Sequence, residues 1–263
     1  MPPLPVFVTV DVEQDCPPFL DTWRGVEEGM PALRRLLAEE QVPATMFVTG
    51  EAARRFPRLV REVVADGHEL GCHGDTHRSF AAMTPAEAAR EIRASTDTLR
   101  AHADVVSFRA PYLQLPTRLL PQLCEAGYEI DSSAGRHKSL RARVERRGGV
   151  LRVPASVTSS TLRWPAAVRD RLFARLRPPV VLFVHPWEFV DLRRARLRFD
   201  CRFRTGGQAL ASLRSAIRLF KARGAWFGRL RDCRELLAGA RGAARPARDD
   251  PRQFAGSPAR RGG

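Results

Sequence analysis

Apolar and polar residues follow one another in this chain in a repeated order, in which short apolar runs are followed by segments of helical spacing. The run PVFVTVD, residues 5–11, is apolar almost to its last residue, as expected for a strand buried on both faces. After it, Met30, Leu33 and Leu37 recur at intervals of three and four residues, which predicts an amphipathic helix. The same order returns along the chain, so the pattern predicts alternating strands and helices.

The pattern predicts about seven strands, each followed by a loop or a helix. The expected strands lie at residues 5–11, 43–50, 68–73, 105–108, 128–133, 179–185 and 225–228. The expected helices lie at residues 25–41, 56–67, 84–102, 117–127, 205–224 and 229–239. One helix start is especially clear, because Thr84, Pro85 and Glu87 have the order of a capping box with proline in the first turn.

Strands that alternate with helices predict a parallel sheet covered by helices, because a parallel connection needs a crossover. For about seven strands in one α/β domain we expect a distorted, partly closed, TIM-like (β/α) barrel. A chain of 263 residues is long enough to bury such a core. We expect residues 1–238 to form the domain. Residues 239–263 are rich in Gly, Ala, Pro and Arg with Phe254 as the single large apolar residue, which predicts a disordered tail.

The charge of the chain is strongly positive. Lys and Arg number 44 against 29 Asp and Glu, and only Lys138 and Lys221 are lysines, so nearly all of the excess is arginine. Such an excess indicates contact with anionic partners, such as phosphorylated substrates, a membrane surface or nucleic acid, or else a compositional bias. The arginines are spread along the whole chain, which favours the bias as the explanation of the total.

Cysteine usage and the N-terminus bear on the compartment. The five cysteines are an odd number, scattered and without a CxxC motif, which predicts reduced thiols. No apolar run approaches the ~20 residues of a membrane span. Residues 1–13 have neither a basic start nor a small-residue cleavage site, so we expect no secretory signal. These features favour a cytoplasmic protein, with peripheral contact at the inner face of the membrane left open.

Chemically active side chains stand where four of the expected strands end. They are Asp11 and Glu13, His73 and His77, Arg109, and His185. Each has an ordinary explanation by itself: a loop-capping acid pair, two loop histidines, a surface arginine, a buried histidine bonded to a carbonyl. However, the C-terminal ends of parallel barrel strands meet at one mouth, where active sites form. The joint placement of these residues therefore favours a functional site.

The same four places resemble the motifs of the polysaccharide deacetylase family, also called the NodB homology or carbohydrate esterase family 4 group. TVDVEQD (9–15) resembles its first motif, HGDTH (73–77) its HxxxH metal motif, RAPY (109–112) its Arg-x-Pro-aromatic motif, and LFVHPWEF (182–189) its last strand with the acid histidine. The HPWE form is similar to a subgroup of these enzymes. The resemblance runs from about residue 5 to 237.

This resemblance implies one bound divalent metal ion, usually Zn²⁺, with Co²⁺, Mn²⁺ or Ni²⁺ as alternatives. A carboxylate and two histidines would hold the ion and leave coordination positions open for water and substrate. His73 and His77 would be the histidines. The family's first motif has two adjacent aspartates, but Val12 occupies the second position here, so the carboxylate is Glu13 or Asp15. Glu13 is preferred because residues i and i+2 share one face of a strand.

The resemblance also implies a reaction, the removal of an N-acyl group (acetyl or formyl) from an amino sugar. Asp11 would take a proton from the attacking water, and Arg109 would keep Asp11 charged and in position. The backbone N–H of Tyr112 would help to stabilise the oxyanion. His185 would donate a proton to the leaving amine.

Four further residues are candidates for contact with the substrate: Trp187, Asp131, Arg202 and Arg204. The family's fourth motif, an Asp near a Trp, appears only as GYEIDSS, so Asp131 is the candidate for tuning His185. Arg202 and Arg204 belong to an arginine-rich segment after HPWEF, which either grips a phosphate or forms a solvated loop. Residues 21–29 resemble a loop in deformylases that act on lipid-linked amino sugars.

The expected substrate is therefore an N-acylated amino sugar, either within a polysaccharide or linked to a lipid or a nucleotide. The linked forms would carry phosphate. We expect no specific nucleic acid as a partner. Two alternatives remain open. One is a catalytically silent, basic relative that binds anionic glycans or nucleic acid, which the vacancy at Val12 favours. The other is a hydrolase of a non-sugar amide. All the residues that the reaction needs are present, which favours an enzyme: the base Asp11, the histidines His73 and His77, Arg109 and the acid His185.

Overall fold

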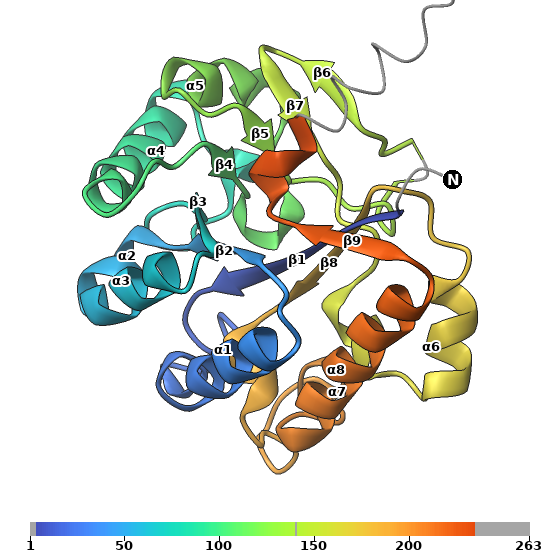
Figure 1. Cartoon of the computed structure of the whole chain (residues 1–263). Coiled ribbons are helices and arrows are strands. Elements are labelled where there is room, and N and C mark those ends of the chain that lie inside the picture. Colours follow the sequence, from blue (N-terminus) through green and yellow to red (C-terminus); the bar gives the residue numbers. More distant parts are fainter. Residues whose placement is uncertain (1–3, 140, 235–263) are drawn as a thin grey trace, which may run out of the picture.

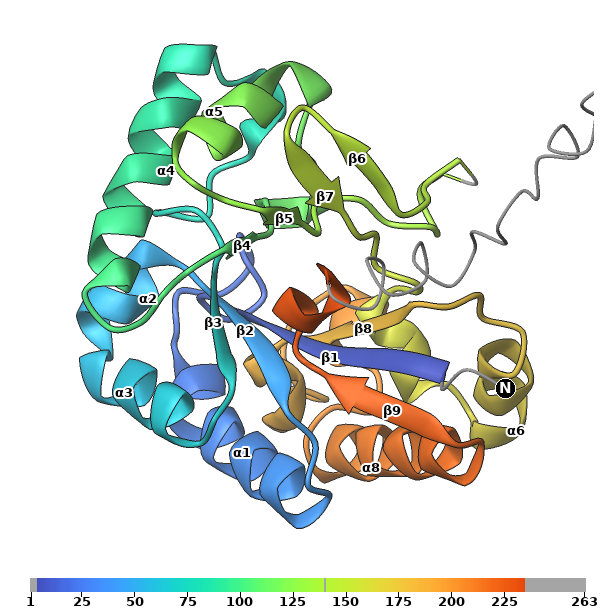
Figure 2. The same cartoon turned by 45° about the horizontal axis from the view of Figure 1, so that its top comes forward.

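The computed structural model describes residues 4–139 and 141–234, which build a curled nine-stranded sheet with helices on its outer face (Figures 1 and 2). The strands follow the spatial order β6-β7-β5-β4-β3-β2-β1-β8, and β9 pairs with β1. Their bounds are β1 Leu4–Val12, β2 Ala44–Val48, β3 Glu69–Cys72, β4 Ser107–Phe108, β5 Ile130–Asp131, β6 Glu145–Arg147, β7 Val150–Arg152, β8 Val180–Val184 and β9 Ala225–Gly228.

Helices connect most of these strands. The α-helices are α1 Met30–Glu39, α2 Gly50–Arg55, α3 Pro57–Ala65, α4 Pro85–Arg100, α5 Leu120–Glu125, α6 Ala166–Phe173, α7 Phe199–Arg202 and α8 Gly207–Ala222. The short turns of other helix types are η1 Gly25–Gly29, η2 Phe80–Ala82, η3 Pro111–Leu113, η4 Thr117–Leu119, η5 Ser159–Arg163, η6 Pro186–Phe189 and η7 Leu230–Asp232. The capping box expected at Thr84 and Glu87 is present at the start of α4.

The α/β fold with a partly closed barrel of parallel strands is confirmed. All strand pairs are parallel except β6 with β7, an antiparallel hairpin that the sequence pattern did not predict. Its turn is Gly148-Gly149, with φ of 58° and 86°, the left-handed pair of a two-residue hairpin turn. The hairpin was missed because β6, ERR, has no apolar alternation. The expected helix at 229–239 is described only up to residue 234, and the expected tail at 239–263 lies outside the described residues.

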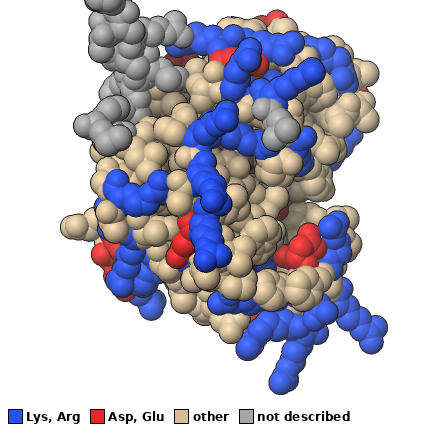
Figure 3. Space-filling model, turned by 90° about the vertical axis from the view of Figure 1, so that its right-hand side faces the viewer, with Lys and Arg blue, Asp and Glu red and all other residues tan. Residues whose placement is uncertain are grey.

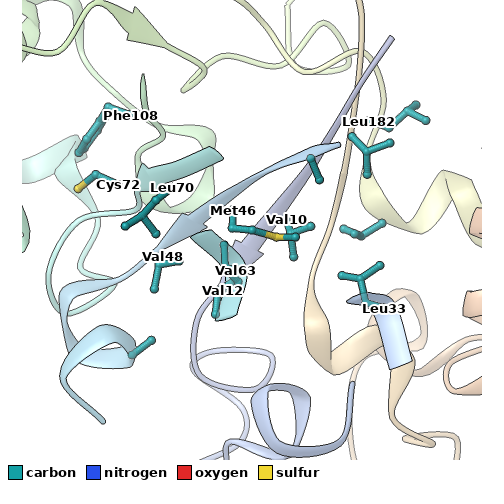
Figure 4. Close-up of a cluster of buried hydrophobic side chains, with 14 of the residues drawn as sticks. Val10, Val12, Leu33, Met46, Val48, Val63, Leu70, Cys72, Phe108 and Leu182 are labelled. Atoms are coloured by element: carbon teal, nitrogen blue, oxygen red, sulfur yellow. The ribbon is translucent and has the colours of Figure 1, made fainter. Parts of the chain in front are cut away.

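The pleat of β1 divides its side chains between two layers. Val8, Val10 and Val12 pack with the helices in the larger apolar cluster (Figure 4). Phe7 belongs to a second cluster, which fills the inside of the curled sheet. Because successive side chains of a strand point to opposite faces, Asp11 shares the inner face with Phe7, and Val12 faces outward.

The strand β1 has neighbours on both sides. Residues 6–10 pair with β8, and on the other edge residues 8–12 pair with β2 and residues 4–7 with β9. Parallel pairing of all three brings the C-terminal end of β1 to the same edge as those of β2 and β8. This edge is where the candidate residues gather.

Two other expectations can be compared with the structure. All five cysteines are free thiols. Within the described part of the chain, no helix is both long and apolar enough to cross a membrane.

Glu69, at the start of β3, ties together the opposite end of the sheet. Its carboxyl oxygens accept hydrogen bonds from Ser107 Oγ at 2.6 Å, Thr45 Oγ1 at 2.7 Å and the Arg231 N–H at 3.0 Å. These donors come from β4, β2 and η7. Burial is the largest influence on the Glu69 carboxyl and raises its pKa.

We expect Glu69→Ala to lower the free energy of unfolding by about 2–4 kcal/mol, because three donors, two of them fully buried, lose their acceptor. Glu69→Gln keeps the volume and one acceptor oxygen, and it should cost less. Since the folded pKa of Glu69 is raised, its stabilisation is complete below the ordinary value of 4.5 and is lost as the pH rises through the raised pKa. Glu69→Gln should lack this pH dependence. Urea unfolding at several pH values measures the loss of stability and its pH dependence. A Glu69→Ala variant as stable as the wild type would contradict the role of Glu69 in holding this end of the sheet.

Candidate active site and metal centre

Arg109 follows β4 and has its guanidinium fully buried inside the curled sheet. Its Nη1 donates to Asp11 Oδ1 at 2.6 Å and to Thr9 Oγ1 at 2.8 Å, and its Nη2 donates to Ser132 Oγ at 2.9 Å. The guanidinium also lies over the Phe47 ring, 4.3 Å from its centroid. An unpaired buried charge is costly, so Arg109 and Asp11 each depend on the other.

Glu13, His73 and His77 form a compact group beside this ion pair. Glu13 Oε2 lies 3.1 Å from His73 Nε2 and 2.6 Å from His77 Nε2. One ligand atom from each of the three residues lies within 4.8 Å of the others. His73 Nδ1 is 2.7 Å from the carbonyl oxygen of Arg109, which can only accept, so Nδ1 carries the proton and Nε2 is free to bind a metal.

The electrostatics of this group suit a cation. Burial by itself would raise the pKa of Glu13, but the charge of His77 and the close contacts of the carboxylate with His73 and His77 hold it far below its ordinary range. Nδ1 of His77 is buried without a hydrogen-bond partner, and His77 has a left-handed φ of 55°. A carboxylate and two imidazole nitrogens are the donor set of a divalent transition metal, so these residues fit such an ion.

Asp15, the other acid considered as a ligand, has a different place. Its Oδ1 accepts from the Gly25 N–H at 2.8 Å and its Oδ2 from Thr22 Oγ1 at 2.7 Å. A Cβ on Gly25 would come within 2.7 Å of Asp15 Oδ1 and 2.5 Å of the Trp187 nitrogen, so only glycine allows this close approach. Asp15 therefore folds the loop after β1, and Glu13 is the carboxylate beside the histidines.

His185 follows β8 and is held by a carboxylate three residues further on. Its Nδ1 is 2.8 Å from Glu188 Oε1, and Glu188 Oε2 lies 2.9 Å from Arg163 Nε. The Arg163 Nε–H is not aligned for a hydrogen bond, so this ion pair is electrostatic. Arg163 in turn donates to the carbonyl oxygens of Asp200 at 2.7 Å and Phe203 at 2.5 Å. Glu188 and Arg163 are almost completely buried.

This surrounding keeps His185 protonated. Burial lowers the pKa of His185, but the hydrogen bond with Glu188 and the charges of Glu13 and Glu188 outweigh it and raise the pKa to about 9. The other ring nitrogen, Nε2, lies 3.9 Å from Glu13 Oε1. His185 therefore presents a proton towards the same place that Glu13 faces.

Two aromatic residues flank the group. The ring of Trp187 stacks on His185, with centroids 4.9 Å apart and an interplanar angle of 19°. Tyr112 lies with its ring 4.8 Å from His77 and has a left-handed φ of 60°, a conformation that an L-residue adopts at a cost. Backbone strain of this kind is concentrated at functional sites.

One cavity of about 440 Å³ joins these side chains. Its lining includes the sequence-based candidates Asp11, Glu13, His73, His77, Tyr112, His185 and Trp187. Arg109 does not line the cavity; it lies behind Asp11. The structure therefore brings together residues from the ends of β1, β3, β4 and β8, as their positions after the strands predicted.

Three candidates lie elsewhere. Asp131 Oδ2 pairs with Arg152 Nε at 2.7 Å and does not contact His185, whose partner is Glu188, so the expected pairing of Asp131 with His185 is corrected. Neither Arg202 nor Arg204 lines the cavity. The arginine-rich segment contributes instead Arg198, which is paired with Asp200 at 3.2 Å, together with Asp200 itself and Cys201.

Sequence reasoning missed the pair Glu188 and Arg163. Glu188 stands in the HPWEF motif, and its spacing of three from His185 was available as a signal, because η6 brings its carboxylate back to the ring and the N–H of His185. Arg163 comes from η5, and nothing in its local sequence marks it. Its contact with Glu188 depends on how the two turns meet.

The fold and the site define a partly closed α/β barrel, with a Glu-His-His group that could hold a metal ion at its C-terminal mouth. Residues 6–130 match the family model for polysaccharide deacetylase. A chitooligosaccharide deacetylase from Sinorhizobium fredii is 30% identical over 158 residues, 59% of this chain and 64% of that protein. Over these residues the chain is similar to the polysaccharide deacetylase family. It spans less than two thirds of the length of the curated relatives it matches.

Solved structures show the same fold. A Mycobacterium smegmatis protein named as a polysaccharide deacetylase has a TM-score of 0.65 and 20% identity, with 97% of this chain and 99% of that chain covered. A family 4 carbohydrate esterase from Streptomyces lividans, in complex with acetate, has a TM-score of 0.59 and 18% identity, with 85% and 91% covered. At these identities the likeness concerns the fold alone.

We expect Glu188→Ala to lower the free energy of unfolding by about 3–5 kcal/mol, because it leaves the Arg163 guanidinium buried without a carboxylate. Replacing both partners, Arg163→Met with Glu188→Leu, should recover much of this loss. Glu28→Ala, which removes the exposed pair of Arg24 and Glu28, is the matched control and should cost less than about 1 kcal/mol. Chemical denaturation measures all three; equal costs for the two Ala variants would refute the role of the buried pair.

Proposed function

We propose that this protein is a metal-dependent hydrolase that removes an acetyl or formyl group from the nitrogen of an amino sugar. The observation that carries the proposal is the grouping of Glu13, His73 and His77 in one cavity with Asp11 and His185. The name of the Sinorhizobium fredii relative, a chitooligosaccharide deacetylase, supports an amino-sugar amide as the substrate. The bond cleaved is then a non-peptide carbon–nitrogen bond.

In this proposal Glu13, His73 and His77 hold one divalent ion, for which Zn²⁺ is the first choice and Co²⁺, Mn²⁺ or Ni²⁺ the alternatives. Three protein ligands leave positions open, as in catalytic rather than structural zinc sites. When bound, such an ion polarises the amide carbonyl and lowers the pKa of water.

The other residues then have separate tasks. Asp11 accepts the proton of the attacking water, and its ion pair with Arg109 keeps the carboxylate in one orientation. The backbone N–H of Tyr112 donates to the oxyanion that forms at the carbonyl. His185 gives the proton on Nε2 to the leaving nitrogen, while Glu188 holds Nδ1. The hydrogen bond with Glu188, which is not one of the proposed metal ligands, raises the pKa of His185 and so favours the protonated ring that this role requires.

Finer features of the substrate and the compartment also belong to the proposal. We infer an anionic group, such as a phosphate, on the substrate, supported by Arg198 and Lys138 in the lining of the cavity. Trp187 would orient the sugar together with the His185 ring that it stacks on. A cytoplasmic location, with peripheral contact at the membrane, is supported by the scattered free thiols.

We expect one equivalent of divalent metal per chain in the wild-type protein, and its loss in His73→Ala and Glu13→Gln, because each removes one of three ligands. Asp15→Asn is the matched control for a buried acid near the site, and it should keep the metal. Elemental analysis after dialysis against Zn²⁺ measures the content, and circular dichroism checks the fold. Metal retained in Glu13→Gln and lost in Asp15→Asn would assign the carboxylate ligand to Asp15.

We expect Asp11→Asn to retain the metal and to lower turnover of an N-acetylated chitooligosaccharide by about two to four orders of magnitude, since the general base is lost. The released acetate gives the rate, and elemental analysis gives the metal content of the same sample. A variant with full turnover would overturn the role of Asp11. A wild-type protein that binds metal and oligosaccharide without releasing acetate would instead support a silent relative.

A further inference from the structure

A second, larger hollow is lined by residues of the loop after β5, of β6 and of the segment just before β8. Its volume is about 1210 Å³. We call it the arginine hollow, because its charged lining residues are Arg136, Arg141, Arg143, Arg147 and Arg177, with Glu145 as the single acid. Figure 3 shows the molecule from the side that faces right in Figure 1, where basic side chains are spread over the surface with few acidic ones between them.

The positive charge of the arginine hollow is poorly compensated by the protein itself. Glu145 is shared between Arg143 at 3.7 Å and Arg147 at 4.0 Å, both long for an ion pair. Across residues 4–139 and 141–234, no carboxylate lies within ion-pair distance of the other three arginines that line it. Burial and the charge of Arg177 lower the pKa of Arg136, as expected for like charges held together. Such an arrangement favours binding of an anion with several charges.

A groove with lining residues in common with both sites lies between the arginine hollow and the active-site cavity. This shallower groove, of about 320 Å³, shares Leu113 and Lys138 with the active-site cavity and Ala142 with the arginine hollow. The lining of this groove contains no Asp or Glu; its charged residues are Lys138 and Arg152. An extended chain that follows this groove between the two sites therefore meets no acidic residue in the groove itself. The acids lie at the ends: Asp11, Glu13 and Asp200 in the cavity, and Glu145 in the arginine hollow.

We propose that the arginine hollow binds the acidic part of an extended glycan, whose N-acylated sugar occupies the active-site cavity. This inference rests on the proposed function and deepens it by naming the substrate class: an oligo- or polysaccharide with carboxylate, phosphate or sulfate groups several sugars away from the reacting amide. Guanidinium groups bind all three anions in a bidentate manner. The lining residues of the arginine hollow include no aromatic ring on which a base could stack, which favours a glycan over single-stranded nucleic acid.

The test compares two triple variants of the full chain with the same change of charge. One replaces Arg141, Arg143 and Arg147 in the arginine hollow with Gln, and the control replaces the exposed Arg61, Arg90 and Arg93 of α3 and α4 with Gln. Binding of fluorescently labelled oligogalacturonate, which carries carboxylates, and of dextran sulfate is measured by anisotropy, with neutral dextran as a further probe. Circular dichroism confirms that both variants fold.

We expect the hollow variant to weaken binding of both acidic probes by about tenfold or more and to reduce its dependence on salt, since charge-assisted contacts are lost. The control should lose less than about threefold, a general effect of net charge. Equal losses in the two variants would overturn the inference. Tighter binding of single-stranded DNA or of phosphatidylglycerol vesicles than of either acidic glycan, through the same arginines, would overturn the ligand class.

Kinetics separate this inference from the proposed function. On a partly N-acetylated oligosaccharide that also carries carboxylates, the hollow variant should raise KM about tenfold with little change in kcat, because the contacts are equal in ground and transition states. A neutral chitooligosaccharide should show a smaller rise in KM. Equal rises on both substrates would overturn the inference and leave the hydrolase in place. No hydrolysis of either substrate, with binding still dependent on the arginine hollow, would overturn the proposed function and support the binding site.

Discussion

The buried ion pair of Arg109 and Asp11 is the contact on which the mouth of this barrel depends. The guanidinium has no access to water, so Asp11, Thr9 and Ser132 must supply its partners from β1 and from the loop after β5. The free-energy cost of burying a charge away from water is offset only when the charge has a full set of hydrogen-bond and ion-pair partners. The contact therefore holds the C-terminal ends of β1, β4 and β5 in one arrangement. His73 is fixed by the same unit, since its Nδ1 bonds the Arg109 carbonyl.

The pleat of β1 explains the unusual DVE sequence at this place. Asp11 and Glu13 are two residues apart and share the inner face, whereas Val12 packs outward with the helices. A carboxylate at position 12 with the same pleat would lie in the apolar layer between sheet and helices. Glu13 reaches the two histidines with its longer side chain from the end of the strand. The two histidines therefore have a carboxylate beside them although position 12 is a valine.

Arginine serves two different purposes in this chain. Arg109 and Arg163 are buried, each next to a carboxylate, at 2.6 Å and 2.9 Å respectively, and they hold the residues that surround the cavity. Arg193 and Arg198 are exposed and paired locally with neighbouring aspartates. The arginines of the loop after β5 have few such partners. The total charge of +15 thus includes the arginine hollow, whose lining arginines have only Glu145 as a carboxylate partner among the described residues.

The sequence alone determined the alternation of strands and helices, the α/β barrel, and the gathering of Asp11, Glu13, His73 and His185 at one mouth, because period and strand polarity are local properties. Only the tertiary structure decided which buried charges meet. Arg163 reaches Glu188 from a distant turn, Asp131 turns to Arg152, and Arg202 stays outside the cavity. Such contacts depend on how the loops fold back over the sheet, and this cannot be predicted from the spacing of residues in the sequence.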